Sequence, residues 1–247
     1  MSVYEKIYSK MGKQKLHMTL IDPATSGVQG SVKIAEQAER AGTDFILIGG
    51  STNLSISEMD NATGAIKSRI ETPVIIFPGS ASMFTKLADA IFFMSLLNSR
   101  DREFIIDHQI KASRIVRQSG IESISMGYLI FEPGMTVGRV GKANLIGRED
   151  ETLAVQYSLA AELLGMSIVY LEAGSGADKH ISCDVVRAVK SNAKIPIIVG
   201  GGIRNEESSR EIAQAGADIV VTGTITERTP DVYSKLKPII DSVKNSA

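Results

Sequence analysis

The sequence predicts a single (β/α)8 barrel, the TIM-barrel fold, over residues 1–247. The chain length is typical of such a barrel. Eight short runs rich in β-branched residues alternate with amphipathic stretches along the chain, as expected for repeated strand–helix units around a parallel sheet. Glycine-rich turns follow the last two runs, which favours a closed barrel over the main alternative, an open doubly wound sheet.

Each predicted strand is followed by residues that are typical of turns. The strands are expected at residues 16–21, 44–49, 74–77, 90–95, 123–129, 167–172, 195–200 and 217–223. Most of the intervening helices begin with a serine or acidic N-cap signal, and several end at a glycine. They are expected at residues 31–41, 57–70, 101–118, 150–164, 182–191, 206–215 and 231–243.

Two segments depart from this regular pattern. Only about a dozen residues separate the third strand from the fourth, so we expect the third helix to be short or missing and the barrel wall to be open there. The segment Phe131–Gly147 has four glycines and no helical period. A loop of this length predicts either a mobile cover over the substrate or a solvated excursion.

The composition narrows the function classes. The chain has 27 basic and 28 acidic residues, which argues against a nucleic-acid partner. Its one cysteine, Cys183, cannot form an internal disulfide. No leader sequence is visible and the apolar runs are too short to span a bilayer, so a soluble, cytoplasmic protein is expected.

Glycines at the ends of the last two strands predict a phosphate site. Gly201 and Gly202 follow the seventh strand, and Gly223 and Thr224 follow the eighth. Residues without a side chain let backbone N–H groups approach an anion, and barrels often bind phosphate between these two loops. Alternatively, the glycines only form tight turns.

Two carboxylates end strands near the same mouth of the barrel. Asp22 ends the first strand and Glu172 the sixth. Asp22 with the hydroxyl of Ser51 and a substrate diphosphate would suffice to hold Mg²⁺. The alternatives are a capping role for Asp22, and an ion pair of Glu172 with Arg204 or Lys179.

The three histidines have no spacing typical of a zinc site. We expect His17 to be a packing residue within the first strand, and His108 and His180 to be solvated. No lysine ends a strand as Schiff-base chemistry would require.

Several strand-end motifs together resemble the geranylgeranylglyceryl phosphate synthase family. The motifs are SIVYLEAGSGADKHIS, LIDP, GGST, FPGS, MSLLNS, IVGGGIR and TGT, and they extend over nearly the whole chain. YLEAGSG is far more specific than the glycine loops. The family is similar to bacterial heptaprenylglyceryl phosphate synthases, so membership alone does not fix the prenyl chain length.

The resemblance implies a magnesium-dependent prenyltransferase that joins geranylgeranyl diphosphate to the C3 hydroxyl of sn-glycerol 1-phosphate, the first committed ether step of archaeal phospholipid synthesis. It implies that Asp22 and Ser51 bind Mg²⁺, although Thr52 could replace Ser51. The lipid product implies transient proximity to a membrane, and a homo-oligomer is expected. The residues implied for glycerol phosphate are Tyr170, Leu171, Glu172, Ala173, Gly174, Ser175, Gly176, Gly201, Gly202, Gly223 and Thr224.

These residues suggest how the reaction would proceed. Glu172 would accept the proton of the glycerol hydroxyl. Tyr170 lies two residues earlier, on the same face of the strand, and would position the glycerol or the carboxylate. The prenyl tail would lie in an apolar groove between the third and fourth strands. Its expected lining is Phe84, Leu87, Phe92, Phe93, Met94 and Leu96.

Three alternatives remain open from the sequence. The same reaction could use another prenyl chain length, such as heptaprenyl. Another phosphate-binding barrel enzyme would share the glycine loops, although it would not need YLEAGSG. A non-catalytic barrel that binds a phosphometabolite is disfavoured, because carboxylates end both the first and the sixth strand.

Overall fold

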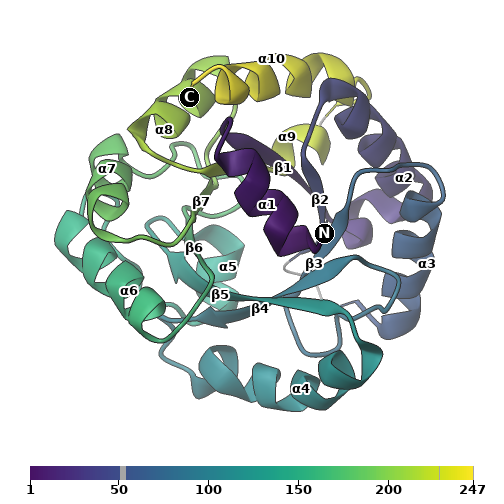
Figure 1. Ribbon diagram of the computed structural model, residues 1–247, viewed down its shortest axis with the longest axis horizontal. Coiled ribbons are helices and arrows are strands. Elements are labelled where there is room, and N and C mark those ends of the chain that lie inside the picture. Colours follow the sequence, from purple (N-terminus) through teal and green to yellow (C-terminus); the bar gives the residue numbers. More distant parts are fainter. Residues whose placement is uncertain (51–53, 228, 247) are drawn as a thin grey trace.

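Eight parallel strands form a closed barrel in the computed structural model, which describes residues 1–50, 54–227 and 229–246 (Figure 1). Neighbouring strands pair in chain order and β8 pairs with β1, so the predicted (β/α)8 barrel is confirmed. The strands are β1 (Leu16–Ile21), β2 (Phe45–Gly49), β3 (Val74–Phe77), β4 (Ala90–Leu96), β5 (Glu122–Ile130), β6 (Ile168–Glu172), β7 (Ile197–Gly200) and β8 (Ile219–Thr222).

Helices surround the barrel, and each predicted helix is present (Figure 1). Side-chain caps define several N-termini, for example Asp150 at α6 and Asn205 at α8. The helices are α1 (Val3–Met11), α2 (Pro23–Ala41), α3 (Ile56–Lys67), α4 (His108–Ser119), α5 (Met135–Val140), α6 (Glu151–Leu163), α7 (Cys183–Asn192), α8 (Glu206–Ala215), α9 (Thr224–Glu227) and α10 (Val232–Lys244). A π-helical turn, η1 (Glu103–Asp107), leads into α4.

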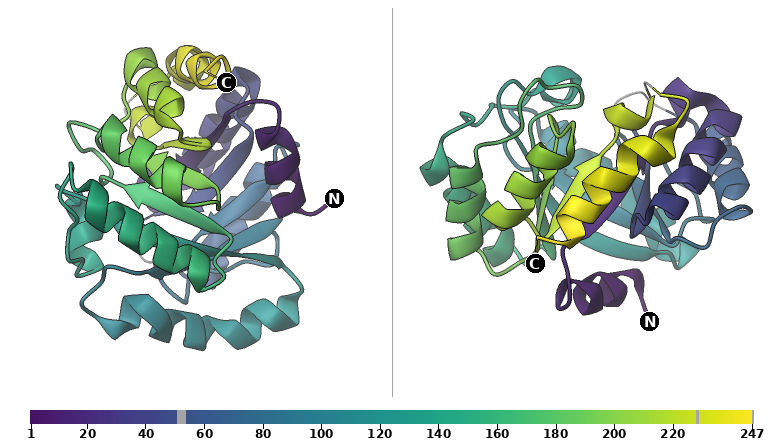
Figure 2. Two further views of the ribbon diagram at one scale, coloured as in Figure 1. Left: turned by 60° about the vertical axis from the view of Figure 1, so that its left-hand side comes forward. Right: turned by 90° about the horizontal axis from the view of Figure 1, so that it is seen from above.

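Helix α1 was not predicted from the sequence, and it covers the end of the barrel at which the strands begin (Figure 2, right). Val3 and Ile7 are buried in the core. The carboxylate of Glu122, at the start of β5, accepts the backbone N–H groups of Val3 and Tyr4 at 2.5 and 2.9 Å. This end of the barrel is therefore covered, which leaves the opposite end as the place for a mouth.

The connection from β3 to β4 contains no helix, as predicted. The predicted opening in the wall is wrong, however, because Ile75 pairs with Ala90 and Ile76 with Ile91. The gap lies in the outer helical layer. There, Met83 and Phe84 of the connection are buried where a helix would otherwise pack.

Segment 131–147 is folded onto the barrel and contains α5, which was not predicted. Phe131 and Ile146 form a β-bridge and are both fully buried. Ala143 forms a second bridge, with Ser99. The alternative of a solvated excursion is therefore wrong, while the mobility of the segment stays a prediction.

Each helix in the described parts of the chain is too short or too polar to span a bilayer.

Candidate active site

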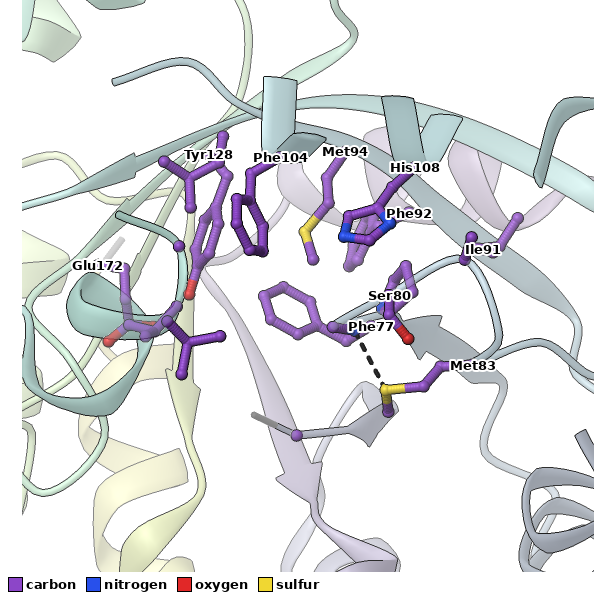
Figure 3. A pocket seen from close by; sticks show the side chains of 18 of the residues that line it. Phe77, Ser80, Met83, Ile91, Phe92, Met94, Phe104, His108, Tyr128 and Glu172 are labelled. Carbon is purple, nitrogen blue, oxygen red and sulfur yellow. Dashed lines mark hydrogen bonds between the residues drawn. The ribbon is translucent and has the colours of Figure 1, made fainter. Parts of the chain in front are cut away.

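A cleft of about 350 Å³ opens at the carboxyl ends of the strands (Figure 3). One end is polar, with Asp22, Glu172, Ser175 and Gly223 among its lining residues. The other end is apolar and reaches the inner face of α4. The cleft therefore joins two chemically different compartments.

Glu172 is the central polar group of the cleft, and the backbone orients its side chain. Its Oε1 accepts the backbone N–H of Gly174 at 2.6 Å. Burial raises the pKa of Glu172, and the interactions with Gly174 and with the hydroxyls of Tyr170 and Tyr128 oppose that rise. Such a carboxylate is oriented and more basic than an exposed one, as proton transfer requires.

Tyr128 was missed in the sequence. Register places it beside Tyr170 on the neighbouring strand, and their rings lie 5.2 Å apart between centroids at 73°. Burial raises the pKa of both phenols well above the usual value, so both hydroxyls remain protonated donors. Its place near the end of a predicted strand could have marked Tyr128 as a candidate. Only the strand register shows that it lies near Glu172.

The glycines after β7 form a close-packed loop beside Glu172. Gly201 and Gly202 have φ values of +82° and +71°, in the left-handed region that favours glycine. A Cβ at Gly201 would lie 2.4 Å from Oε1 of Glu172. The hydroxyls of Ser175 and Thr224 lie 2.7 Å apart and link the loops after β6 and β8. The structure thus brings the predicted anion-binding loops together.

Two of the predicted substrate residues point away from the mouth. Leu171 and Ala173 are fully buried in the cluster between the barrel and its helices. Successive side chains of a strand face opposite sides, so these two face outward where Tyr170 and Glu172 face inward. Their side chains therefore cannot contact a ligand in the cleft.

Asp22 lines the cleft and also caps α2. Its Oδ1 accepts the backbone N–H of Ala24 at 2.9 Å, so the capping alternative is confirmed. A Cβ at Gly50 would lie 2.2 Å from Oδ2, which shows how closely this carboxylate packs on the loop after β2. Burial raises the pKa of Asp22, although three hydrogen bonds oppose the rise.

The donor set suits a magnesium ion that is held mainly by a diphosphate. Asp22 supplies a carboxylate, the hard oxygen ligand that Mg²⁺ prefers. Ser51 and Thr52, the predicted hydroxyl ligands, lie outside the described residues. Within the described ranges, no group of three or more His, Cys, Asp or Glu side chains could hold a metal by itself.

The alternative reading of Glu172, an ion pair with Arg204 or Lys179, is not found in the described part of the chain. Arg204 instead donates to the carboxylate of Asp178 at 3.1 Å and to the carbonyl of Gly176 at 2.9 Å. It therefore stabilises the loop after β6 and leaves the Glu172 carboxylate directed at the cleft.

Most of the residues predicted for the apolar groove line the cleft, but Leu87 does not and is 41% exposed. Phe77, Phe104 and Val137 line it without having been predicted. Figure 3 shows Phe77 between Tyr128 and the more distant Met83. The predicted lining residues that the cleft includes are Phe84, Phe92, Phe93, Met94 and Leu96.

The expectations for the histidines were correct only for His17. His17 is fully buried and its ring lies 3.0 Å from the hydroxyl of Thr43 and 2.9 Å from that of Thr222. His108 lines the cleft, and its Nδ1 is buried without a hydrogen-bond partner in the structure as described. The side chain of His180 is only 14% exposed.

The whole chain resembles known proteins in sequence and in fold. Residues 9–243 match the model of the PcrB family. The geranylgeranylglyceryl phosphate synthase of Picrophilus torridus is 56% identical over 243 residues, covering 98% of this chain and 100% of that protein. The crystal structure of (S)-3-O-geranylgeranylglyceryl phosphate synthase from Thermoplasma acidophilum in complex with substrate sn-glycerol-1-phosphate is 53% identical, covers 99% of both chains and has a TM-score of 0.97.

Solved structures with low identity show the fold alone. A tryptophan synthase from M. tuberculosis is 13% identical with a TM-score of 0.66. The family assignment rests instead on the full-length match and on relatives above 50% identity. The chain therefore belongs to the PcrB family, together with proteins named geranylgeranylglyceryl phosphate synthase.

Proposed function

We propose that this chain transfers the geranylgeranyl group of geranylgeranyl diphosphate to the C3 hydroxyl of sn-glycerol 1-phosphate. The observation that carries the proposal is the place of Glu172, a buried carboxylate between glycine-rich loops and an apolar cleft. The relative from Thermoplasma acidophilum, crystallised with sn-glycerol-1-phosphate, supports the choice of acceptor.

Glycerol phosphate would lie against the loops after β6, β7 and β8. Backbone N–H groups around Gly201 and Gly202 would bind its phosphate, since no side chain blocks their approach. Ser175 and Thr224 would add hydroxyl donors from the adjoining loops. This placement directs the glycerol hydroxyl toward Glu172.

The prenyl tail would fill the apolar end of the cleft. Each buried CH₂ group contributes about 0.8 kcal/mol. Phe92, Met94 and Phe104 provide surfaces that a flexible chain can follow. Filling the cleft would also exclude water, which would otherwise compete with the glycerol hydroxyl for the allylic carbon.

In the transfer, the C1–O bond of the donor breaks and diphosphate leaves with the electron pair. The glycerol C3 oxygen forms the new ether bond to C1, and its proton passes to Glu172. A positioned general base of this kind contributes about 10² to 10⁴ in rate. The backbone N–H of Gly174 keeps the carboxylate turned toward the acceptor.

The enzyme would require Mg²⁺, held by Asp22 and a hydroxyl of the loop after β2 at Ser51. When bound, the ion would neutralise the charge of the leaving diphosphate. Asp22 supports this role because its carboxylate lines the same cleft as Glu172. The predicted cytoplasmic location and homo-oligomeric state stay predictions.

The test is an assay of the purified protein with sn-glycerol 1-phosphate, Mg²⁺ and prenyl diphosphates of different lengths. We expect the highest kcat/KM with the geranylgeranyl donor. Preference for a heptaprenyl donor would revise the chain length, and no ether product with any donor would reject the function. Omitting Mg²⁺ tests the metal requirement separately.

A further inference from the structure

Helix α4 and the turn η1 form a wall with two different faces. The inner face lines the apolar cleft through Phe104, His108 and Ala112. Of all residues in η1 and α4, only Val116 is buried, so most of this wall is open to solvent on its other side. Figure 1 shows α4 as the outermost element on its side of the barrel.

The outer face combines exposed isoleucines with arginines. Ile106 and Ile110 are 42% and 56% exposed and lie four residues apart, close to one another along the helix. Arg114 and Arg117 are exposed and lie four and seven residues beyond Ile110, which continues the same side of the helix. We define these four residues as the α4 outer stripe.

The stripe carries positive charge that its surroundings do not neutralise. Residues 102–117 contain four basic and two acidic side chains, a formal charge of +2 (4 − 2). The two acids are engaged, because Asp107 pairs with Arg102 at 3.2 Å and Glu103 with Lys111 at 3.6 Å. Among the described residues, no ion pair joins Arg114 or Arg117 to an acidic group.

We propose that the α4 outer stripe docks the enzyme on the surface of an anionic lipid bilayer. Isoleucines flanked by arginines on one helical face suit the boundary between acyl chains and anionic headgroups. A second copy of this chain fits less well, because a two-fold contact would place the positive stripes against each other. The inner face of the same helix would then hold a prenyl tail close to the bilayer, in which such tails are soluble.

Only the placement of the prenyl tail rests on the proposed function. Vesicle binding should therefore be measured without substrates. Flotation with vesicles of phosphatidylcholine alone, or mixed with phosphatidylglycerol, measures it at low and high salt. We expect binding to the anionic vesicles that weakens at high salt. Arg114→Gln with Arg117→Gln should weaken it by about fivefold for each arginine, and Ile106→Gln with Ile110→Gln should also weaken it.

The matched control is Leu163→Gln with Leu164→Gln at the end of α6, where the side chains are 87% and 70% exposed. This pair should leave vesicle binding unchanged, and all three double variants should retain activity with a donor presented in detergent. The proposal is overturned if the wild type binds neither vesicle, or if the leucine pair reduces binding as strongly as the isoleucine pair. It is also overturned if Ile106→Gln with Ile110→Gln alters only the oligomeric state in light scattering.

Discussion

The rings of Tyr128 and Tyr170 meet edge to face, with their centroids 5.2 Å apart, and both hydroxyls act to lower the pKa of Glu172. The two phenols come from adjacent strands, β5 and β6. Their packing fixes the position of the two phenols, while the backbone N–H of Gly174 fixes the direction of the carboxylate. Glu172 is thereby a preorganised group rather than a free acid in a cleft.

Glu172→Gln should reduce kcat by about 10² to 10⁴, because the amide cannot accept the glycerol proton. Its oxygen can still accept the N–H of Gly174, so the KM for glycerol phosphate should change little. Steady-state kinetics with both substrates measure the two effects. The control is Glu149→Gln, which changes an 82% exposed carboxylate. Turnover at the wild-type rate in Glu172→Gln would remove the proton-acceptor role.

The same variant should alter the dependence of stability on pH. Burial raises the pKa of Glu172 in the folded state. The folded protein therefore binds this proton more tightly than the unfolded chain, and stability from this group is lost as pH rises through the folded pKa. Glu172→Gln should thus gain Tm relative to the wild type as pH rises from acid to neutral. A constant difference in Tm across that range would contradict the shift.

Tyr128→Phe should move the acid limb of the kcat/KM profile to higher pH. The variant keeps the ring contact with Tyr170 but loses one hydrogen bond that lowers the pKa of Glu172. The control is Tyr8→Phe, on α1 at the opposite end of the barrel. An unchanged profile with a lower kcat would indicate that Tyr128 contacts the substrate instead.

Asp22→Asn and Asp22→Ala separate the metal role from the capping role. Asparagine caps a helix about as well as aspartate, whereas alanine costs about 1 kcal/mol. We therefore expect a near-wild-type Tm for Asp22→Asn and a lower Tm for Asp22→Ala. Both variants should lose the activity that depends on added Mg²⁺. Activity titrated against Mg²⁺ and thermal unfolding are the measurements. Wild-type Mg²⁺ dependence in Asp22→Asn would rule out the ligand.

His108→Leu should lower the KM for the prenyl donor severalfold. Nδ1 of His108 is buried without a partner in the described structure, and a buried unsatisfied polar group costs about 1 to 3 kcal/mol. A bound tail would remove water that could otherwise reach it. The matched variant is His108→Gln, which keeps polar atoms and should not improve binding. A higher KM in His108→Leu would mean that the imidazole contacts the bound prenyl donor.

The sequence by itself determined the barrel, the missing third helix and the loops where substrate groups should gather. These features depend on local patterns: strand and helix periods, N-caps such as Asp150, and glycines after β7 and β8. The sequence also identified Asp22 and Glu172, because a carboxylate at the end of an apolar run is a pattern of only a few consecutive residues.

Only the tertiary structure decided which side chains meet. Strand register places Tyr128 beside Tyr170, and the strand alternation turns Leu171 away from the mouth. Helix α1 begins with a capping box formed by Ser2 and Glu5, but only the structure shows that it contacts Glu122, more than one hundred residues away, and covers the barrel. Contacts between distant residues depend on the packing of the whole barrel, which no local run of sequence records.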